Sequence, residues 1–586
     1  MRNSGRIAAL CAILIVFAAA SRAATDSAAT TKWNALVDEY LDQAAFHFKP
    51  TDGTSAGLHQ YDALLEDYSR SAIASNIRVL HQFEKRVARF NGKGLSQTEA
   101  ADREIVLGNI RSSLLTLEVI RPWEKNPDTY SGGITNSIYV IMNRKFASSD
   151  DRLKPVIARE KQMPGVFDQA RLNLKNPPRI YTEIALEQLP DLVSFFKNDV
   201  PAAFADAKDE NTKAQFAKSN AAVIEALQKY EAWLRTDLLA RSNGDFRFGT
   251  QVYAKKLLYD EMVDTPVDRL LEIGLADLHR NQAEFVRIAK EVDAAKSPRQ
   301  ILEQLGATHP SPDQLIPTFT RTFDGLIAFI QNQHILTIPS EIRPIVEETP
   351  PFDRATTTAS MDTPGPFEKV ATEAYFNVTL PDPQDTPEQV NSYMSIFNRG
   401  TIVSTAIHET YPGHYVQFLW TPSAPTKVRK LLGSSSNAEG WAHYCEQMML
   451  DEGFGQPGRG AADMGETRLI RLGQLQDALL RDARFVVGIQ MHTGKMTFEE
   501  AVKFFETDGY QFHENAVIEA KRGTSDATYL YYTLGKIQIL KLREDLKKRQ
   551  GASFSLEKFH NDFLSQGFPA IRIVRKALLG DDSPTL

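Results

Sequence analysis

The sequence predicts a mainly α-helical protein that carries one small antiparallel β element. Apolar residues recur three and four positions apart along most of the chain, which is the spacing of amphipathic helices. Helix-start signals of known chemistry precede several of these segments. One stretch, residues 335–386, breaks the pattern because it is rich in proline and threonine and lacks the helical period.

The helical period is clearest in six segments, each long enough for three or more turns. These segments are 33–46, 73–90, 184–196, 214–239, 267–292 and 469–491. Ser297-Pro298 and Ser311-Pro312 each pair a helix-capping serine with proline at the first helical position. Thr497 with Glu500 three residues on forms a capping box ahead of a further helix.

Three short strands are predicted within residues 335–386, at 336–338, 345–347 and 374–379. The last alternates in hydropathy and is followed by Pro381 and Pro383. The chain thus divides into an N-terminal helical part (24–334), a β insert (335–386) and a C-terminal helical part (387–586). No polar linker separates them, so we expect a single domain over 24–586.

The first 23 residues have the pattern of a secretory signal peptide. Arg2 and Arg6 precede an apolar run over 7–20, and Ser21-Arg22-Ala23 has the small-x-small pattern of a cleavage site, with the cut after Ala23. Leu10 directly before Cys11 argues against a lipoprotein signal. We therefore expect a periplasmic or secreted protein.

The composition excludes several classes of protein. The chain of 586 residues is 42% hydrophobic and 24% charged, as globular proteins are. Its net charge of −7 includes no basic block, which argues against nucleic-acid binding. No apolar run beyond the signal is long enough for a membrane span. Removal of the signal leaves Cys445 as the one cysteine, so no intramolecular disulfide can form, and we expect Cys445 to be buried.

The segment His408-Glu409-Thr410-Tyr411-Pro412-Gly413-His414 carries the strongest chemical signal, inside a predicted helix over 391–420. Zinc-protease helices place two histidines four residues apart on one face. Here the spacing is six, so on a regular helix the two rings diverge by about 120°. Pro412 removes a backbone donor and Gly413 relaxes steric limits, which predicts a break that brings both rings to one metal.

A catalytic zinc ion held by two histidines needs a third protein ligand. Glu439 is the best candidate, because a turn at residues 434–436 lets a second helix return toward the histidines. His443 is an alternative ligand or a residue that orients one, and Glu446 is a weaker candidate ligand. Glu409, next to His408, is the candidate general base.

These residues resemble those of the bacterial domain-of-unknown-function family 885, whose members look like gluzincin-type zinc metallopeptidases. The family motif His-Glu-x-x-Pro-Gly-His matches 408–414, and its Glu-Gly-Trp matches 439–441. The resemblance implies His408, His414 and Glu439 as zinc ligands and Glu409 as base. It also implies a metallopeptidase-like helical body with a deep cleft, in which 374–379 is an edge strand that pairs with substrate.

The family also has a late arginine and tyrosine ahead of a glycine, which match Arg522, Tyr532 and Gly535. The resemblance implies that Tyr532 stabilises the oxyanion and that Arg522 binds a substrate carboxylate. This chain departs from the commoner family pattern with Asp526-Ala527-Thr528. Rival candidates are therefore Tyr529 and Tyr531 for the tyrosine and Lys521 for the arginine.

We expect an exported zinc metallopeptidase that hydrolyses oligopeptides by Glu409-assisted attack of a zinc-bound water. Capture of a C-terminal carboxylate by the arginine would make it a carboxypeptidase or dipeptidase. Two alternatives remain open: a zinc amidase acting on cell-wall peptides, and a non-catalytic binding or scaffold protein with an inert metal site. The intact Glu409 counts against the last of these. The sequence gives no signal for an oligomeric state.

Overall fold

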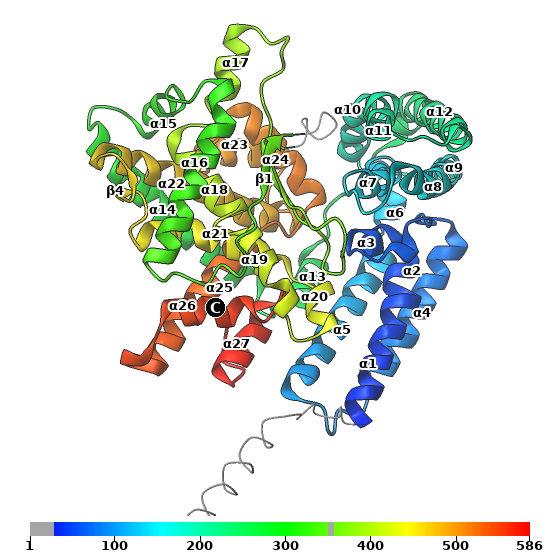
Figure 1. The fold of residues 1–586 in the computed structure, drawn as a ribbon, viewed down its shortest axis with the longest axis horizontal. Helices are drawn as coiled ribbons and strands as arrows, with labels where there is room; N and C mark the ends of the chain where they lie inside the picture. The colour runs from blue at the N-terminus through cyan, green and yellow to red at the C-terminus, as the bar shows by residue number, and fades with distance from the viewer. Residues whose placement is uncertain (1–27, 350–356) are drawn as a thin grey trace, which may run out of the picture.

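The computed structural model describes residues 28–349 and 357–586, and it confirms a mainly helical protein with a small sheet (Figure 1). The predicted signal peptide, 1–23, lies outside these residues. Within the described part of the chain, no helix combines the length and the apolar character needed to cross a membrane.

The N-terminal helices occupy one side of the molecule, drawn in blue to cyan in Figure 1. They are α1 (Ala28–Tyr40), α2 (Phe46–Phe48), α3 (Pro50–Ser55), α4 (Arg70–Ala88), α5 (Gln97–Leu115), α6 (Pro122–Lys125), α7 (Gly132–Met142), α8 (Ser149–Glu160), α9 (Met163–Asn173), α10 (Arg179–Ser194), α11 (Val200–Ala203) and α12 (Glu210–Trp233). One-turn π-helical segments extend α1, α5, α10 and α12.

The remaining helices form the other side of the molecule. Those before the β insert are α13 (Thr250–Glu261), α14 (Val267–Val292), α15 (Pro298–Gly306) and α16 (Pro312–Asn332). Those after it are α17 (Pro387–Met394), α18 (Arg399–Glu409), α19 (His414–Trp420), α20 (Lys427–Leu431), α21 (Ser435–Asp451), α22 (Met464–His492), α23 (Phe498–Thr507), α24 (His513–Ser525), α25 (Tyr531–Gln550), α26 (Leu556–Leu564) and α27 (Ile571–Leu579).

Local sequence signals fix several of these helices. The segment predicted at 267–292 is α14 with the same bounds, and all six predicted segments are helical over most of their length. Thr497 forms the predicted capping box of α23. Ser297 caps α15 as predicted, with Pro298 in the first turn, and with Gln300 it also forms a capping box. Ser311 precedes α16 as predicted, although its side chain makes no capping hydrogen bond.

The β insert holds a three-stranded sheet of β1 (Ile345–Glu348), β2 (Ala359–Asp362) and β3 (Tyr375–Val378), in the order β1-β3-β2. The prediction of an antiparallel element is wrong in part, because β3 pairs parallel to β1 and antiparallel to β2. The predicted edge strand at 374–379 is also wrong. Since β3 is central and both its edges are already paired, it cannot pair with a substrate backbone. A further two-residue pair, β4 (Gln456–Pro457) and β5 (Gly460–Ala461), precedes α22.

The strand predicted at 336–338 is absent, since these residues are irregular. Side chains bond the backbone N–H and C=O of Thr337, which a β-ladder would otherwise pair. Asn561 Oδ1 accepts from Thr337 N at 2.9 Å. The indole of Trp420 donates to Thr337 O at 3.1 Å. Leu336 and Ile338 pack on the core, which explains their apolar alternation without a strand.

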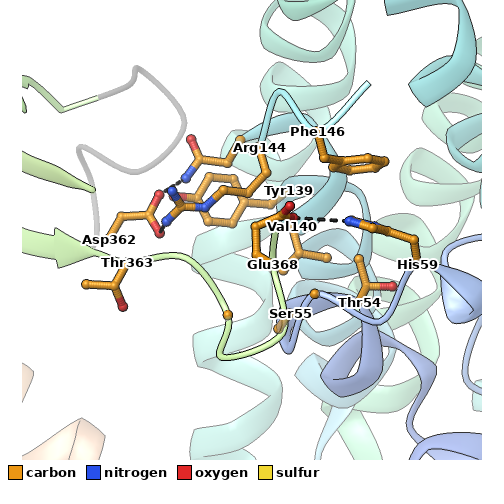
Figure 2. Close-up of a pocket in the computed structure, with 13 residues that line it drawn as sticks. Thr54, Ser55, His59, Tyr139, Val140, Arg144, Phe146, Asp362, Thr363 and Glu368 are labelled. Atoms are coloured by element: carbon orange, nitrogen blue, oxygen red, sulfur yellow. Dashed lines mark hydrogen bonds and ion pairs between the residues drawn. The ribbon is translucent and has the colours of Figure 1, made fainter. Parts of the chain in front are cut away.

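The loop after β2 is fastened to the N-terminal helices (Figure 2). Phe367 N donates to Ala56 O at 2.9 Å. Gly365 permits this approach, because a Cβ there would lie 2.2 Å from Ser55 O. On either side of this contact, His59 bonds Glu368 at 3.1 Å and Arg144 pairs with Asp362. These contacts tie β2 and the loop after it to the segments that directly follow α3 and α7.

The core consists of several apolar clusters. The largest joins α16, the sheet, α18, α21 and α25 to α27. A second is built from the helices α7 to α12, and a third from α1, α4 and α5 with residues of α20 and α27. Cys445 is free and buried within the first cluster, as predicted. The motif helix α18 therefore stands in the main core of the protein.

Candidate metal centre

The predicted helix over 391–420 is broken twice rather than once. The first break follows α17 and ends at Asn398, whose side chain accepts hydrogen bonds from Gly400 N and Thr401 N at 3.0 and 3.1 Å and starts α18. The second break separates α18, which ends at Glu409, from α19, which begins at His414. It is the break that the six-residue spacing predicts.

Pro412 and Gly413 shape this second break. The Tyr411–Pro412 peptide bond is cis, and Gly413 N donates to Ile407 O at 3.0 Å. A Cβ on Gly413 would lie 1.8 Å from His408 O and 2.3 Å from Ile407 O. Glycine is therefore needed for close approach of the backbone, because any side chain would push α18 and α19 apart.

The break brings His408 and His414 to one point, together with Glu439 from the first turns of α21. One possible ligand atom from each of the three residues lies within 4.8 Å of the other two. Glu439 Oε2 is 3.5 Å from His408 Nε2 and 3.4 Å from His414 Nε2. Among residues 28–349 and 357–586, no other histidine, cysteine or carboxylate residues form such a group of three.

This donor set fits a catalytic metal. Two imidazole nitrogens and one carboxylate oxygen are ligands that zinc takes in catalytic sites, where a fourth position stays open. The two rings lie nearly perpendicular, at 88°, with centroids 4.8 Å apart, so they approach the common point from different directions. His408 is buried, whereas His414 and Glu439 are half-buried and keep the group accessible.

The charges in the group reinforce one another. Burial acts to raise the pKa of Glu439, but the adjacent His414 and His408 hold this pKa well below its usual range. Burial and Arg481 act to lower the pKa of His408, yet hydrogen bonds to Glu439 and Glu446 outweigh them and raise it to about 9. A cation bound at His408 replaces the proton that its imidazole otherwise holds.

The Glu-Gly-Trp sequence of α21 has a structural reason at each position. Glu439 belongs to the three-residue group. Gly440 lies against Gly535 of α25, since a Cβ on Gly440 would be 2.4 Å from Gly535 Cα. Trp441 is fully buried, and its indole donates to Pro412 O at 3.0 Å. The motif thereby joins the break to the helix that carries Glu439.

Glu446, a candidate ligand, lies on the other side of the His408 ring. Its Oε1 is 2.6 Å from His408 Nδ1, the nitrogen that faces away from Glu439. His443 Nδ1 is 3.2 Å from Glu446 Oε2, so His443 contacts Glu446 and is not part of the three-residue group. Burial, followed by the nearby Lys536, lowers the pKa of His443 to about 3.

Sequence reasoning missed Arg481 on α22, whose guanidinium lies 3.2 Å from Glu446 Oε1. No motif marks this arginine, because it reaches the site only through the packing of α22 against α18 and α21. The contact between Glu446 and His408 did leave a signal. Glu446 follows Glu439 by seven residues, so both lie on one face of α21.

The candidate base Glu409 is the last residue of α18, directly after His408. Its side chain is half-buried. No hydrogen bond or ion pair joins its carboxylate to any residue that the structure describes. An acidic side chain without a partner, next to a group of possible metal ligands, is available to accept a proton.

Tyr532 lies beside the group, and the rival tyrosines are placed differently. The Tyr532 ring is nearly parallel to that of His408, with centroids 6.4 Å apart. Tyr531 donates to Asp526 at 2.8 Å. Tyr529 is fully buried, and its hydroxyl has no partner within the described residues. The structure thus brings Tyr532, ahead of its rivals, to the metal-ligand candidates.

Arg522 is linked to this tyrosine. Its guanidinium donates to the hydroxyls of Tyr531 and Tyr532 at 3.3 Å each, and pairs with Asp526 at 3.2 Å. The rival Lys521 instead pairs with Glu187 of α10 at 2.7 Å. Of the two basic residues, Arg522 is therefore the one that contacts Tyr532.

The fold and the site define a mainly helical protein with a His/His/Glu group at a helix break. The chain belongs to the family described as "Bacterial protein of unknown function (DUF885)", whose model matches residues 50–578. A comparison with curated proteins finds no match to the sequence.

Solved structures with a similar fold include two whose descriptions name no function. One is described as "a putative lipoprotein of unknown function from Shewanella oneidensis"; it is 25% identical, with a TM-score of 0.77, over 94% of this chain and 100% of the other. The second is described as "the putative lipoprotein from Colwellia psychrerythraea"; it is 18% identical, with a TM-score of 0.78, over 94% of this chain and 99% of the other.

Proposed function

We propose that this protein is a zinc-dependent metallopeptidase of the gluzincin type that hydrolyses peptide bonds in oligopeptides. The observation that carries the proposal is the meeting of His408, His414 and Glu439, whose possible ligand atoms lie within 4.8 Å of one another at a helix break. Two helix-breaking residues, Pro412 and Gly413, lower the stability of the helix. A break that also brings metal ligands together is easier to explain by a functional site than by packing.

In this proposal, His408, His414 and Glu439 hold the zinc ion. When bound, zinc supplies a Lewis acid that polarises a carbonyl and makes a water molecule more acidic. Glu409 accepts the proton of the attacking water and passes it to the leaving amine. Its carboxylate suits this role because no other described residue engages it.

Tyr532 and Arg522 act on the substrate. The Tyr532 hydroxyl donates a hydrogen bond to the oxygen that gains negative charge when the carbonyl is attacked. Arg522 keeps donor capacity beyond its contacts with Asp526 and the two tyrosines, and its side chain is 37% exposed. Binding of a substrate carboxylate by Arg522 makes the protein a carboxypeptidase or dipeptidase.

We further propose that the protein is exported and works in the periplasm or outside the cell, with its site in a deep cleft. The signal-like residues 1–23 support export. Two proteins of similar fold are described as putative lipoproteins, which also supports export. That location favours one second candidate, hydrolysis of cell-wall peptides by the same site.

Metal analysis of the purified wild type tests the proposal first. We expect one zinc per chain, lost in His408→Ala and His414→Ala. Glu409→Gln should keep zinc but no longer hydrolyse a peptide library, whereas Glu452→Gln, at the exposed C-terminal end of α21, should keep both. A folded wild type that binds no zinc, or a Glu409→Gln variant with full turnover, contradicts the proposal.

The choice of substrate decides between the two candidates. Library peptides with free and amidated C-termini test whether Arg522 binds a carboxylate, since amidation should then reduce turnover. Cell-wall stem peptides, assayed in parallel, test the second candidate. Turnover of stem peptides alone favours the amidase, and turnover of unrelated oligopeptides favours the peptidase.

A further inference from the structure

Glu446 is a buried carboxylate that the proposed reaction does not use, yet three donors from three helices converge on it. His408 Nδ1 of α18 lies 2.6 Å from Oε1. Arg481 of α22 lies 3.2 Å from the same oxygen. His443 Nδ1 of α21 lies 3.2 Å from Oε2. The Glu446 side chain is completely inaccessible to solvent, and these three residues are its hydrogen-bond and ion-pair partners among the described residues.

The Arg481 guanidinium is a permanent cation 3.2 Å from Glu446 Oε1, so the Glu446 carboxylate faces a positive charge and acts as the hydrogen-bond acceptor. An ionised carboxylate accepts hydrogen bonds and cannot donate one. Each nitrogen that faces Glu446 therefore carries a hydrogen, including Nδ1 of His408.

A neutral imidazole has one N–H and one lone pair. In the neutral form that a metal binds, the hydrogen on Nδ1 leaves the lone pair of His408 on Nε2, the atom that is 3.5 Å from Glu439. This is the nitrogen that belongs to the group of possible ligands. The contact with Glu446 thus selects the tautomer and the ring orientation that a metal requires at Nε2.

We propose that Glu446 is a positioning residue, which holds His408 with its proton on Nδ1 and its Nε2 lone pair directed at the metal. The proposal rests on the function proposed above. Glu446 does not touch the metal or the substrate and acts through His408. Its second oxygen, held by His443, prevents the carboxylate from turning away.

His443 and Arg481 have supporting roles in this arrangement. His443 has no other polar partner among the described residues, because its Nε2 is buried without a hydrogen bond. Its contact with Glu446 is therefore its one polar interaction in the described structure. Arg481 also lies over the Tyr532 ring, 5.6 Å from the centroid. Glu446 and Arg481 together therefore link the His408 ring to the Tyr532 ring.

The test measures zinc affinity by competition with a chromophoric chelator, on folded protein checked by circular dichroism. Glu446→Gln keeps the size of the side chain and removes its charge, and should weaken zinc binding by about 10- to 100-fold. The matched control Glu452→Gln, at the exposed end of the same helix, should bind zinc as the wild type does. Equal affinity of Glu446→Gln and wild type overturns the proposal.

A spectroscopic readout separates positioning from general stability. In the zinc-loaded wild type labelled with nitrogen-15 histidine, we expect a hydrogen-bonded, slowly exchanging Nδ1–H signal that is absent in His408→Ala. This signal should be lost or shifted in Glu446→Gln. An unchanged signal in that variant contradicts the proposal, even where zinc affinity falls.

A second variant covers the case in which Glu446→Gln does not fold. Glu446→Asp keeps the charge next to Arg481 but is one methylene shorter, so it should bind zinc more weakly than wild type. If it matches the wild type in both affinity and spectrum, the positioning role is wrong. If the wild type binds no zinc, the proposed function itself is wrong. If the wild type binds zinc and the Glu446 variants match it, only the positioning role is wrong.

Discussion

Gly440 of α21 and Gly535 of α25 lie in direct backbone contact. A Cβ on Gly440 would be 2.4 Å from Gly535 Cα, and one on Gly535 would be 1.9 Å from Ser436 O. The two helices can approach this closely only without side chains at the crossing. Since Glu439 directly precedes Gly440 and Tyr532 is one turn before Gly535, the crossing sets the distance between a candidate ligand and the candidate oxyanion donor.

Gly535→Ala should therefore destabilise the protein. The added methyl group meets backbone atoms that cannot move aside, which costs at least the 1–3 kcal/mol or so typical of an overpacked core. Urea unfolding measures the change. Gly325→Ala is the matched control, because Gly325 is an exposed position of α16 with nothing within 4 Å of an added Cβ. There alanine should stabilise by up to about 1 kcal/mol; equal effects of the two substitutions contradict this account of the crossing.

Gly413→Ala should impair zinc binding more than it impairs folding. The methyl group would lie 1.8 Å from His408 O, so relief requires that α18 and α19 separate and that the two histidines move apart. We expect zinc affinity to fall by at least about 10-fold, in line with other changes that reorient a ligand. Isothermal titration with zinc measures it. Wild-type affinity in a folded Gly413→Ala protein would show that the break does not set the ligand geometry.

Sequence patterns predicted most of the features of the fold that are set by residues close together in the chain. Apolar spacing and capping residues located α14, α15 and α23, since amphipathic periodicity and caps act within a few residues. The helix break at Pro412 and Gly413 followed from the same kind of local argument. The sheet did not, because strand order is set by long-range pairing. Nothing within 374–379 distinguishes a central strand from an edge strand.

The same division applies to the candidate site. His408, His414 and Glu439 were predictable because each belongs to a short motif, and the structure brings the three together. Arg481 was not, because its contact with Glu446 exists only through the packing of α22. The proposed roles of Glu409 as base, Tyr532 as oxyanion donor and Arg522 as carboxylate ligand stay predictions.

Tyr532→Phe should keep the fold and the zinc content while it lowers kcat by about 100- to 1000-fold, the usual cost of a lost oxyanion donor. Only the hydroxyl is removed, so the packing against His408 persists. Peptide hydrolysis under saturating substrate measures kcat. Tyr531→Phe is the control, because that hydroxyl is bound to Asp526, and its kcat should change little. A larger loss in Tyr531→Phe would transfer the role to Tyr531.

Glu160 gives a prediction on stability that is independent of the metal site. Burial raises the pKa of this carboxyl from 4.5 to about 7, and hydrogen bonds from Ser219 and Asn220 offset the rise only in part. The folded state therefore binds the proton more tightly than the unfolded state. Stability from this group is present below pH 4.5 and is lost as pH rises through 7, with a total of about 3 kcal/mol.

Glu160→Gln should remove this dependence, because the amide stays neutral and can still bond both Ser219 and Asn220. Urea unfolding at pH 5 and pH 8.5 measures the difference between variant and wild type. The variant should gain relative to the wild type at the higher pH by about 1–3 kcal/mol. Glu225→Gln on the exposed face of α12 is the control and should show no such gain. A difference between Glu160→Gln and wild type that does not change with pH means that Glu160 is ionised in the folded protein across this range.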